Sequence, residues 1–531
     1  MFAMYDIVLK DGLIIDGTGA RSFRGSVALI DGKIAYVGTQ DNLEGKKVID
    51  CRSLHITPGF IDAHSHGDIV LGHEFPSFAK LSQGITTEVV GQCGISMAPV
   101  SAENIDKLLK YVESFMISAP EDISQYITYK GYRDCVKKQE LYLNCRFLVG
   151  HGTLRIAVMG YEDRKPSAEE MELMKSMLRE AMENGALGMS TGLIYAPGVY
   201  ADTEELVELC KVVSEYGGLY VTHMRNESFD VVKSVKEAIH IAREAGTALQ
   251  ISHHKVAGSK NWGLSKETLR LVDEARASGM KITLDQYPYE AGMTHLNVLI
   301  PPQYLATGIP GLVKMLRDPV KRAEIKEEMI DPKIPFDNFY HNCGGFKGVF
   351  VTGTPKTPEA DGQLISDYAQ TLGKDEFETY FDLLLQNDGL GTGAFFAMGA
   401  EDMERIISYP YTMPGSDGIV KRAEDPTHPR GLACFPRAIC HFVKERRLMS
   451  LEEMIYKMTL LPAQSLGMPS KGALKEGLDA DITVFDYEKL HDEADYQHPK
   501  RVTAGMKYVF VNGKLAYENG VLKAKGLGKV L

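Results

Sequence analysis

Eight short apolar runs alternate with amphipathic segments through the middle of the chain, and this alternation constrains the fold more than any other feature. Strands of an all-parallel sheet are buried on both faces and read as continuous apolar runs, and helices connect them. Eight such units predict an α/β fold of the closed (β/α)8 TIM-barrel type. The runs are GFIDAHSH, TTEVVGQCG, CRFLVGHG, GALGMSTG, GLYVTHMR, ALQISHHK, KITLDQYPY and YTMPGSDG.

Several segments between the runs have helical periodicity, and most of them end at a Gly that favours a helix C-terminus. These segments are SAEEMELMKSMLREAMENG, TEELVELCKVVSEYG, VVKSVKEAIHIAREAG and SKETLRLVDEARASG. An open doubly wound sheet is the alternative architecture, and it would be expected to carry a Gly-rich phosphate turn after its first strand. This chain has His-Ser-His at 64–66 in that place, which favours the barrel.

The two ends of the chain have a different sequence pattern from the middle. Residues 5–57 read as short strands with Asp-Gly turn signals at 11–12 and 31–32. The same pattern returns only in DADITVFDYEKL and MKYVFVNGKLAYENGVL near the C-terminus. We therefore predict that residues 1–57 and 463–531 form one small β-domain, a β-sandwich, and that residues 58–462 form the barrel.

One connection is much longer than the others. Roughly 120 residues separate the seventh and eighth runs, from Glu290 to about Ser408, where a short helix would suffice. A loop excursion of this length is usually functional or a subdomain of its own. We predict that its first half, residues 290–345, is a lid over the barrel mouth.

The charge balance restricts the class of ligand. The chain has 531 residues, with 71 acidic and 59 basic side chains and a net charge of −12, and no basic cluster. This composition argues against nucleic acid or an anionic membrane surface as the main partner and favours a small molecule. No apolar run approaches the roughly 18 residues that a spanning helix needs. The sequence makes no prediction about oligomeric state.

The chain is expected to be cytoplasmic, on two grounds. The segment MFAMYDIVLKDG carries Asp and Lys where a secretory signal would have its apolar stretch. Eight cysteines without paired spacing are typical of reduced thiols rather than of a disulfide framework.

Four histidines stand at the ends of predicted strands. His64 and His66 end the first run, and positions i and i+2 of a strand point the same way, towards the barrel mouth where active sites lie. His223 closes the fifth run and His253 the sixth. Neutral imidazoles suit Zn²⁺, so the set predicts a metal site, with hydrogen-bonded core histidines as the alternative. Only one of His253 and the adjacent His254 can face the metal.

A cysteine and an aspartate occupy similar positions. Cys93 ends the second run in VVGQCGIS. A free cysteine is more often a small buried hydrophobe, but a thiolate beside Zn²⁺ could serve one metal or bridge two. Asp417 ends the eighth run in PGSDG. Beside a metal, this carboxylate can take a proton from water and deliver it to a leaving amine. A simple turn residue is the alternative.

Three further residues are candidate substrate anchors. Lys255 follows the histidine pair, Tyr287 stands in DQYPYEAG and Arg430 stands in THPRG. A Lys, a phenol and an Arg near a cationic site would suit a carboxylate-bearing substrate. Surface ion pairing is the alternative for the Lys and the Arg. No role is predicted for His151 and His428.

At this point the motifs resemble a known family. PGFIDAHSHGD at 58–68 and the C-terminal GALKEGLDADITVFD resemble the amidohydrolase superfamily. Within it, GQCGIS, VGHGTLR, STGLIYAPGVYADTEEL, THMRNE, ISHHK, YPYEAG, PGSDG and THPR resemble the N-acyl-D-amino-acid deacylases, or D-aminoacylases. The resemblance implies a distorted barrel and hydrolysis of an N-acyl-D-amino acid to a carboxylate and a free D-amino acid.

The resemblance also implies roles for the candidate residues. It favours His253 over His254 and implies one tightly held Zn²⁺ and a weaker second site, with Asp417 as the acid and base. The tight site would comprise Cys93, His223 and His253, the weaker one His64, His66 and Asp417, and the α-carboxylate anchors would be Lys255, Tyr287 and Arg430.

Two positions depart from the family pattern, and two other functions remain as alternatives. Gln92 stands where Asn is common, and Met293 stands where a Ser donates to the substrate carboxylate, which a thioether cannot do. A cyclic amide hydrolase, such as a dihydroorotase or hydantoinase, would carry a carboxylated Lys at the end of the fourth strand, where residues 189–192 read MSTG. A catalytically inactive scaffold is a more remote alternative, since such a barrel would tend to lose its ligands.

Overall fold

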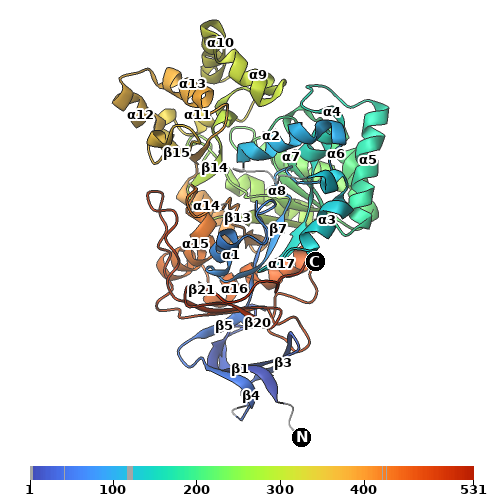
Figure 1. The fold of residues 1–531 in the computed structure, drawn as a ribbon, viewed down its shortest axis with the longest axis vertical. Helices are drawn as coiled ribbons and strands as arrows, with labels where there is room; N and C mark the ends of the chain where they lie inside the picture. The colour runs from blue at the N-terminus through green and yellow to red at the C-terminus, as the bar shows by residue number, and fades with distance from the viewer. Residues whose placement is uncertain (1–3, 41, 116–122, 421, 426) are drawn as a thin grey trace.

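The computed structural model of the chain describes residues 4–40, 42–115, 123–420, 422–425 and 427–531 (Figure 1). Parallel strands form the central wall, and each of the eight predicted runs contains one of them, the third run being split into two short strands. In chain order they are β6 (Phe60–Asp62), β7 (Ile85–Val90), β8 (Asn144–Phe147) with β9 (Val149–Gly150), β10 (Gly188–Gly192), β11 (Leu219–His223), β12 (Ala248–Ile251), β13 (Ile282–Gln286) and β17 (Thr412–Pro414).

The strands pair in the order of a TIM-type barrel. One sheet runs β6-β7-β8 and the other runs β9-β10-β11-β12-β13-β17, and β8 leads directly into β9. A parallel bridge between Ser65 and Gly418 joins the segments that follow β6 and β17. The amide of Asp417 also donates to the carbonyl of His64 at 2.8 Å. The first and eighth strands therefore meet, and the residues that follow them lie at one end of the barrel.

The four helices anticipated from periodicity are confirmed and cover the outside of the barrel (Figure 1). The first begins at a capping box formed by Ser167 and Glu170, and the third ends at Gly246 in the left-handed conformation, as its terminal Gly indicates. Their apolar faces belong to the largest hydrophobic cluster of the molecule. The four are α5 (Ala168–Glu183), α6 (Thr203–Glu215), α7 (Val231–Ala245) and α8 (Ser265–Ala277).

Other helices complete the shell around the barrel. They are α1 (Glu74–Leu81), α2 (Ile105–Phe115), α3 (Tyr129–Lys137), α4 (His151–Met159), α14 (Ala400–Ser408), α15 (Arg430–Arg437), the π-helical η8 (Ala438–Glu445), α16 (Leu451–Met458) and α17 (Leu460–Ser465). Within the described residues, no helix combines the length and apolar character needed to span a membrane.

Both ends of the chain contribute to one nine-stranded sheet. The order is β21-β20-β19-β18-β5-β1-β2-β3, with β4 pairing with β1. The junction between the two ends is the antiparallel pairing of β5 with β18, in which Thr57 faces Thr483. The strands are β1 (Tyr5–Ile14), β2 (Phe23–Ile30), β3 (Lys33–Gly38), β4 (Gly45–Asp50), β5 (His55–Pro58), β18 (Ile482–Phe485), β19 (Met506–Val511), β20 (Lys514–Glu518) and β21 (Val521–Leu522).

The two Asp-Gly signals have different outcomes. Asp31 and Gly32 connect β2 to β3 in an antiparallel hairpin, as predicted. The turn predicted at Asp11 and Gly12 is wrong, because both residues lie inside β1. The register with β2 shifts between Leu9 and Gly12, and Asp11 has a φ of 62°. The pair therefore forms a bulge, which uses the same left-handed tolerance as a turn without reversing the chain.

The long connection after β13 folds as a unit of its own, at the opposite end of the molecule from the N-terminal strands (Figure 1). Its antiparallel sheet has the order β14-β16-β15. Because the first strand pairs with the last, both halves of the connection belong to the same unit. Its elements are β14 (Ala291–His295), α9 (Gly308–Met315), α10 (Pro319–Ile330), α11 (Phe339–Asn342), β15 (Val349–Gly353), α12 (Ile365–Leu372), α13 (Glu376–Gln386) and β16 (Thr392–Phe396).

Candidate metal centre and active site

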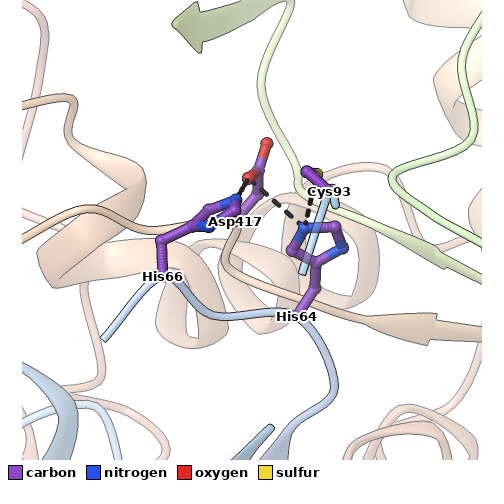
Figure 2. A group of neighbouring side chains, drawn as sticks. All are labelled: His64, His66, Cys93 and Asp417. Carbon is purple, nitrogen blue, oxygen red and sulfur yellow. Dashed lines mark hydrogen bonds and ion pairs between the residues drawn. The ribbon is translucent and has the colours of Figure 1, made fainter. Parts of the chain in front are cut away.

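Two groups of ligand-type side chains meet at the C-terminal ends of the barrel strands, and both contain Cys93. Within each group the candidate ligand atoms lie within 4.8 Å of one another, and every member is buried. Figure 2 shows the first group. The first comprises His64, His66, Cys93 and Asp417, and the second comprises Cys93, His223 and His253. The structure thus brings together all six side chains that the sequence analysis selected as ligands.

The thiol of Cys93 lies between two imidazoles. Its Sγ is 3.4 Å from Nε2 of His64 and 3.4 Å from Nε2 of His253. Burial alone would raise the pKa of Cys93, but the charges of these two histidines hold it well below its usual range. The structure therefore favours a thiolate, the form in which cysteine binds metal.

Three of the six candidate ligands have left-handed backbone conformations. The φ angles are 53° for Cys93, 33° for His253 and 46° for Asp417. Such values are uncommon for residues other than glycine, and backbone strain of this kind clusters at functional sites. The amide of His253 is held by a hydrogen bond of 2.8 Å to the Asp285 carboxylate. The turns that follow the strands are thereby fixed in conformations that aim these side chains at one point.

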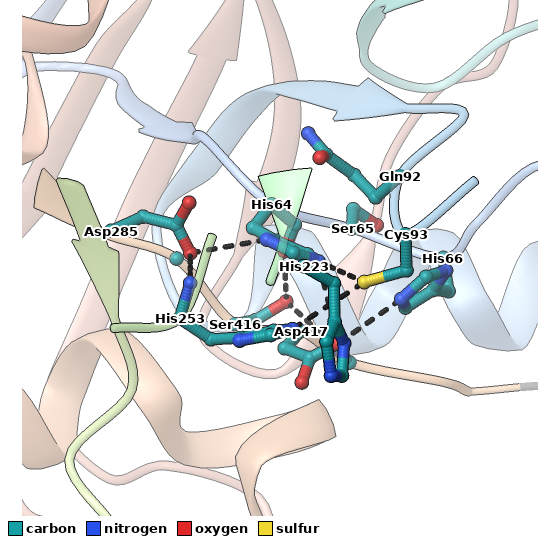
Figure 3. A network of polar contacts seen from close by, with 12 residues as sticks. His64, Ser65, His66, Gln92, Cys93, His223, His253, Asp285, Ser416 and Asp417 are labelled. Carbon is teal, nitrogen blue, oxygen red and sulfur yellow. Dashed lines mark hydrogen bonds and ion pairs between the residues drawn. The ribbon is translucent and has the colours of Figure 1, made fainter. Parts of the chain in front are cut away.

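Two carboxylates that the sequence analysis did not select orient the histidines. Nδ1 of His64 is 3.1 Å from Asp285 (Figure 3), and Nδ1 of His253 is 3.1 Å from Glu227. With Nδ1 engaged in this way, each ring presents Nε2 to Cys93, an arrangement that also fixes the tautomer of metal-binding histidines. Position offered a signal for both carboxylates. Asp285 lies in the seventh apolar run, and Glu227 follows His223 by four residues.

His223 and His254 differ in their hydrogen bonding. Neither ring nitrogen of the buried His223 makes a hydrogen bond within the described part of the chain, and a Glu227 oxygen lies 3.5 Å from its Nε2. His254 instead pairs through Nε2 with Thr268 Oγ1 at 2.8 Å, and burial lowers the pKa of His254 to about 4. Of the adjacent pair, the structure therefore places only His253 beside Cys93.

Asp417 is held by a cation and by the first histidine pair. Its carboxylate is 2.9 Å from Nη1 of Arg430 and 3.1 Å from Nε2 of His66. Although burial raises it, the charges of Arg430 and His64 hold the pKa of Asp417 well below its usual range. The carboxylate is thus ionised at neutral pH and can accept a proton.

The three proposed anchors lie around the same centre. Nζ of Lys255 is 2.8 Å from both carboxylate oxygens of Glu227, and the Arg430 guanidinium faces the ring of Tyr287 at 4.6 Å. Lys255 and Arg430 are 8% and 1% exposed, so neither forms a surface ion pair. The two unassigned histidines are buried outside both ligand groups. His151 pairs with Glu205, and His428 pairs with the carbonyl of Ala291.

A buried polar network centred on Lys80 connects the first strand, β6, to the loop that carries Asp417. Nζ of Lys80 lies 2.5 Å from Asp62 and 3.0 Å from the hydroxyls of Ser65 and Ser416. The Ser65 hydroxyl donates to Glu88 at 2.6 Å. Sequence periodicity gave no sign of this network, because its members come from four separate segments. Through it, one ammonium group ties the His64–His66 segment to the residue that precedes Asp417.

The cavity at the metal centre is closed on one side by the inserted unit. Met293, Thr294, Phe339 and Phe395 of that unit line it together with the strand-end residues. The backbone carbonyl of Met293 also accepts a hydrogen bond of 3.1 Å from Arg430. The insertion therefore contributes walls to the site.

A barrel of this topology with imidazole, thiolate and carboxylate groups at its strand ends defines a metal-dependent hydrolase class. The chain belongs to the amidohydrolase family, whose sequence profile matches residues 47–321 and 362–517.

Within this family the chain belongs to the branch of the D-aminoacylases and N-acyl-D-amino-acid deacylases. It is 32% identical to a D-aminoacylase of Alcaligenes xylosoxydans xylosoxydans over 99% of this chain and 97% of that protein. It is 33% identical to an N-acyl-D-aspartate deacylase of the same organism, over 100% and 95%. A similar solved structure is an N-acyl-D-glutamate deacylase of Bordetella bronchiseptica complexed with zinc and a phosphonate inhibitor. Its TM-score is 0.83 at 32% identity, with 100% of each chain covered.

Proposed function

We propose that this protein hydrolyses the amide bond of N-acyl-D-amino acids to a carboxylate and a free D-amino acid. The observation that carries the proposal is the position of Asp417, whose carboxylate lies within 4.8 Å of the Cys93 sulfur and of two imidazoles at the barrel mouth. The relatives of this chain that carry such activities in their names match it over nearly the whole length of both proteins.

The donor set fits a zinc ion. The ring nitrogens of the buried His223 lack hydrogen-bond partners among the described residues, and Cys93 carries the features of a thiolate. Buried nitrogen and sulfur donors suit Zn²⁺. Cys93, His223 and His253 would hold the tightly bound ion, and His64, His66 and Asp417 would form a weaker second site. When bound, Zn²⁺ supplies a Lewis acid that polarises a carbonyl and lowers the pKa of water.

The protein's own groups would then carry the proton and hold the substrate. Asp417 accepts a proton from water as the water attacks the acyl carbon, and it delivers that proton to the nitrogen as the amide bond breaks. Lys255, Tyr287 and Arg430 bind the α-carboxylate by charge and hydrogen bonding. Met293 presents a thioether and therefore adds no hydrogen bond to that carboxylate.

We infer a domain organisation in keeping with this function. Residues 58–462 form a distorted (β/α)8 barrel that carries the site, and residues 1–57 and 463–531 form a small β-domain built on the nine-stranded sheet. Residues 290–345 act as a lid, a role supported by the place of Met293 and Phe339 in the cavity wall.

A cyclic amide hydrolase remains the alternative function, and the fourth strand weighs against it. Residues 189–192, in which β10 ends, contain no lysine that could be carboxylated. Cys93 belongs to both ligand groups and could bridge two metals in place of such a lysine. An inactive scaffold has less support still, because all six candidate ligands are present, including the proposed base Asp417.

The decisive experiment is an activity screen of the zinc-loaded protein. It compares N-acetyl-D-amino acids with their L-isomers and includes dihydroorotate and hydantoin. Release of free amino acid from the D-isomers supports the proposal. Turnover of L-isomers alone, or of the cyclic amides alone, would overturn it.

A further inference from the structure

A second cavity adjoins the one at the metal centre. Tyr195 and Asp337 line both cavities. The ring of Tyr195 packs between the rings of His223, at 5.2 Å, and His295, at 5.1 Å, so this side chain is the partition. We call the second cavity the side chamber.

The side chamber is larger than the cavity at the metal centre. The space at the metal centre amounts to about 40 Å³, and that of the side chamber to about 240 Å³. Since one water needs roughly 10–15 Å³ by this kind of measure, the first holds only a few waters. The side chamber is therefore the larger of the two spaces for a substituent of the substrate.

The walls of the side chamber are predominantly hydrocarbon. Most of the lining residues come from the segment that follows β10 and from the inserted unit, and the apolar ones include Ile194, Val199, Val298, Ile300, Leu305 and Phe336. Such walls favour a group that gains by leaving water.

The charged groups of the side chamber are already compensated. Arg225 donates to Glu237 and to the backbone carbonyls of Val199 and Ala201. His295 is neutral, because burial lowers its pKa to about 3. Among the described lining residues, no cation therefore remains to pair with a ligand carboxylate.

Asp337 adds a reason to exclude an anion. Its carboxylate accepts hydrogen bonds from the amide of Glu227 at 2.8 Å and from the side chains of Ser228 and Asn342, each at 2.7 Å. A substrate carboxylate entering the side chamber would approach this acceptor and lose its hydration without a partner.

We propose that the side chamber binds an uncharged apolar substituent, so that this enzyme prefers N-acyl derivatives carrying an apolar group over those of acidic D-amino acids. This inference rests on the proposed function. Sequence identity does not decide between these substrates, because the chain is 32% identical to a D-aminoacylase and 33% identical to an N-acyl-D-aspartate deacylase and to an N-acyl-D-glutamate deacylase. The apolar group is either the amino-acid side chain or the acyl chain.

The first test is a substrate series with the unaltered zinc-loaded enzyme. One arm compares kcat/KM for N-acetyl derivatives of D-alanine, D-leucine, D-phenylalanine, D-aspartate, D-glutamate and D-lysine. The other lengthens the acyl chain on D-alanine from acetyl to hexanoyl. Burial of a leucine-sized group predicts a gain of roughly tenfold to a hundredfold in one arm, which identifies the occupant.

The outcomes separate this inference from the proposed function. Preference for D-aspartate, D-glutamate or D-lysine, or equal rates throughout both arms, would overturn the side-chamber proposal and leave the deacylase function standing. Failure to hydrolyse any N-acyl-D-amino acid would overturn both.

A variant locates the effect in the side chamber. Val298→Phe places a larger side chain in its wall and should lower kcat/KM for the best apolar substrate at least about tenfold, with a much smaller effect on N-acetyl-D-alanine. Val320→Phe is the matched control, since Val320 is 65% exposed on α10 of the same inserted unit. An unchanged ratio of the two substrates in Val298→Phe would contradict the proposal.

Discussion

The guanidinium of Arg430 lies 2.9 Å from the carboxylate of Asp417, with both groups buried at the barrel mouth. One is the proposed substrate anchor and the other the proposed proton carrier. In the proposed reaction the same cation would serve two steps, because it would attract the substrate carboxylate and its charge lowers the pKa of Asp417. Substrate binding and proton transfer should be coupled through this contact.

Replacing Asp417 tests the proton carrier directly. Asp417→Ala should retain the tightly bound zinc and lower kcat at least about 10²-fold, the usual scale for a general acid and base. Elemental analysis of the purified variant and steady-state kinetics measure the two quantities. A near-normal kcat would exclude Asp417 from proton transfer.

Replacing Arg430 should move the acid limb of the pH profile. The positive charge of Arg430 lowers the pKa of Asp417, so Arg430→Gln should raise that pKa and shift the acid limb of kcat/KM to higher pH. KM should also rise if Arg430 binds the α-carboxylate. Arg422→Gln is the control, because it breaks an ion pair with Asp425, and neither residue belongs to the ligand groups. This variant should leave the acid limb of kcat/KM at the same pH as in the wild type. An unshifted limb in Arg430→Gln would contradict the coupling.

Metal content tests the role of Cys93. Cys93→Ala should bind less zinc per chain after dialysis, because Cys93 is shared by both ligand groups. Cys210→Ala provides the control, since Cys210 is also buried but lies on the inner face of α6, in the large hydrophobic cluster. Equal zinc content in the two variants would remove Cys93 from the metal centre.

The buried Lys80 should matter for stability far more than a surface lysine. Lys80→Met leaves Asp62 and Glu88 without their cation, and loss of one partner of a buried ion pair costs about 3–5 kcal/mol. The exposed pair of Lys33 with Asp479 should be worth at most about 1 kcal/mol, so Lys33→Met is the control. Thermal unfolding compares the two variants, and similar midpoints would contradict a stabilising role for the Lys80 network.

Lys457 predicts a pH-dependent difference in stability. It is 1% exposed, donates to the carbonyl of Tyr409, and burial lowers its pKa from 10.5 to about 8. Between these values the unfolded chain binds a proton that the folded chain does not, so the free energy of unfolding rises with pH. Lys457→Met removes the contribution of this titration to the free energy of unfolding.

The stability of the wild type relative to Lys457→Met should therefore increase by about 3 kcal/mol as the pH rises from about 8 to 10.5, at 1.36 kcal/mol per pKa unit. Thermal unfolding of both proteins across this range measures it. A constant difference would show that Lys457 does not titrate in this window.

The barrel strands and the candidate ligands could be predicted because their signals are local. Parallel strands buried on both faces must be apolar throughout, and a polar residue that ends such a run must lie at the rim of the sheet. His64, His223 and Cys93 carry this signature in the sequence alone. The signal gives the end of the barrel on which each side chain lies.

The supporting carboxylates could not be predicted in the same way. The contacts of Glu227 with His253 and of Asp285 with His64 join residues that are 26 and 221 positions apart, and their distances depend on the packed barrel. The bulge at Asp11 was missed because Asp-Gly tolerates left-handed backbone in a turn and in a strand alike. The pairing of β14 with β16 was missed because about 100 residues lie between the two strands.

The pairing of β5 with β18 also determines when the terminal sheet can form during synthesis. The hydroxyl of Thr57 bonds to the carbonyl of Thr483, 426 positions later. At about 5–20 residues per second, the N-terminal strands leave the ribosome about 20 to 90 s before their partner exists. During that interval the edge of β5 that will bind β18 is open to other chains, and the barrel must be translated before the sheet can be completed. Synthesis of the C-terminal strands is thus the step that covers the open edge of β5.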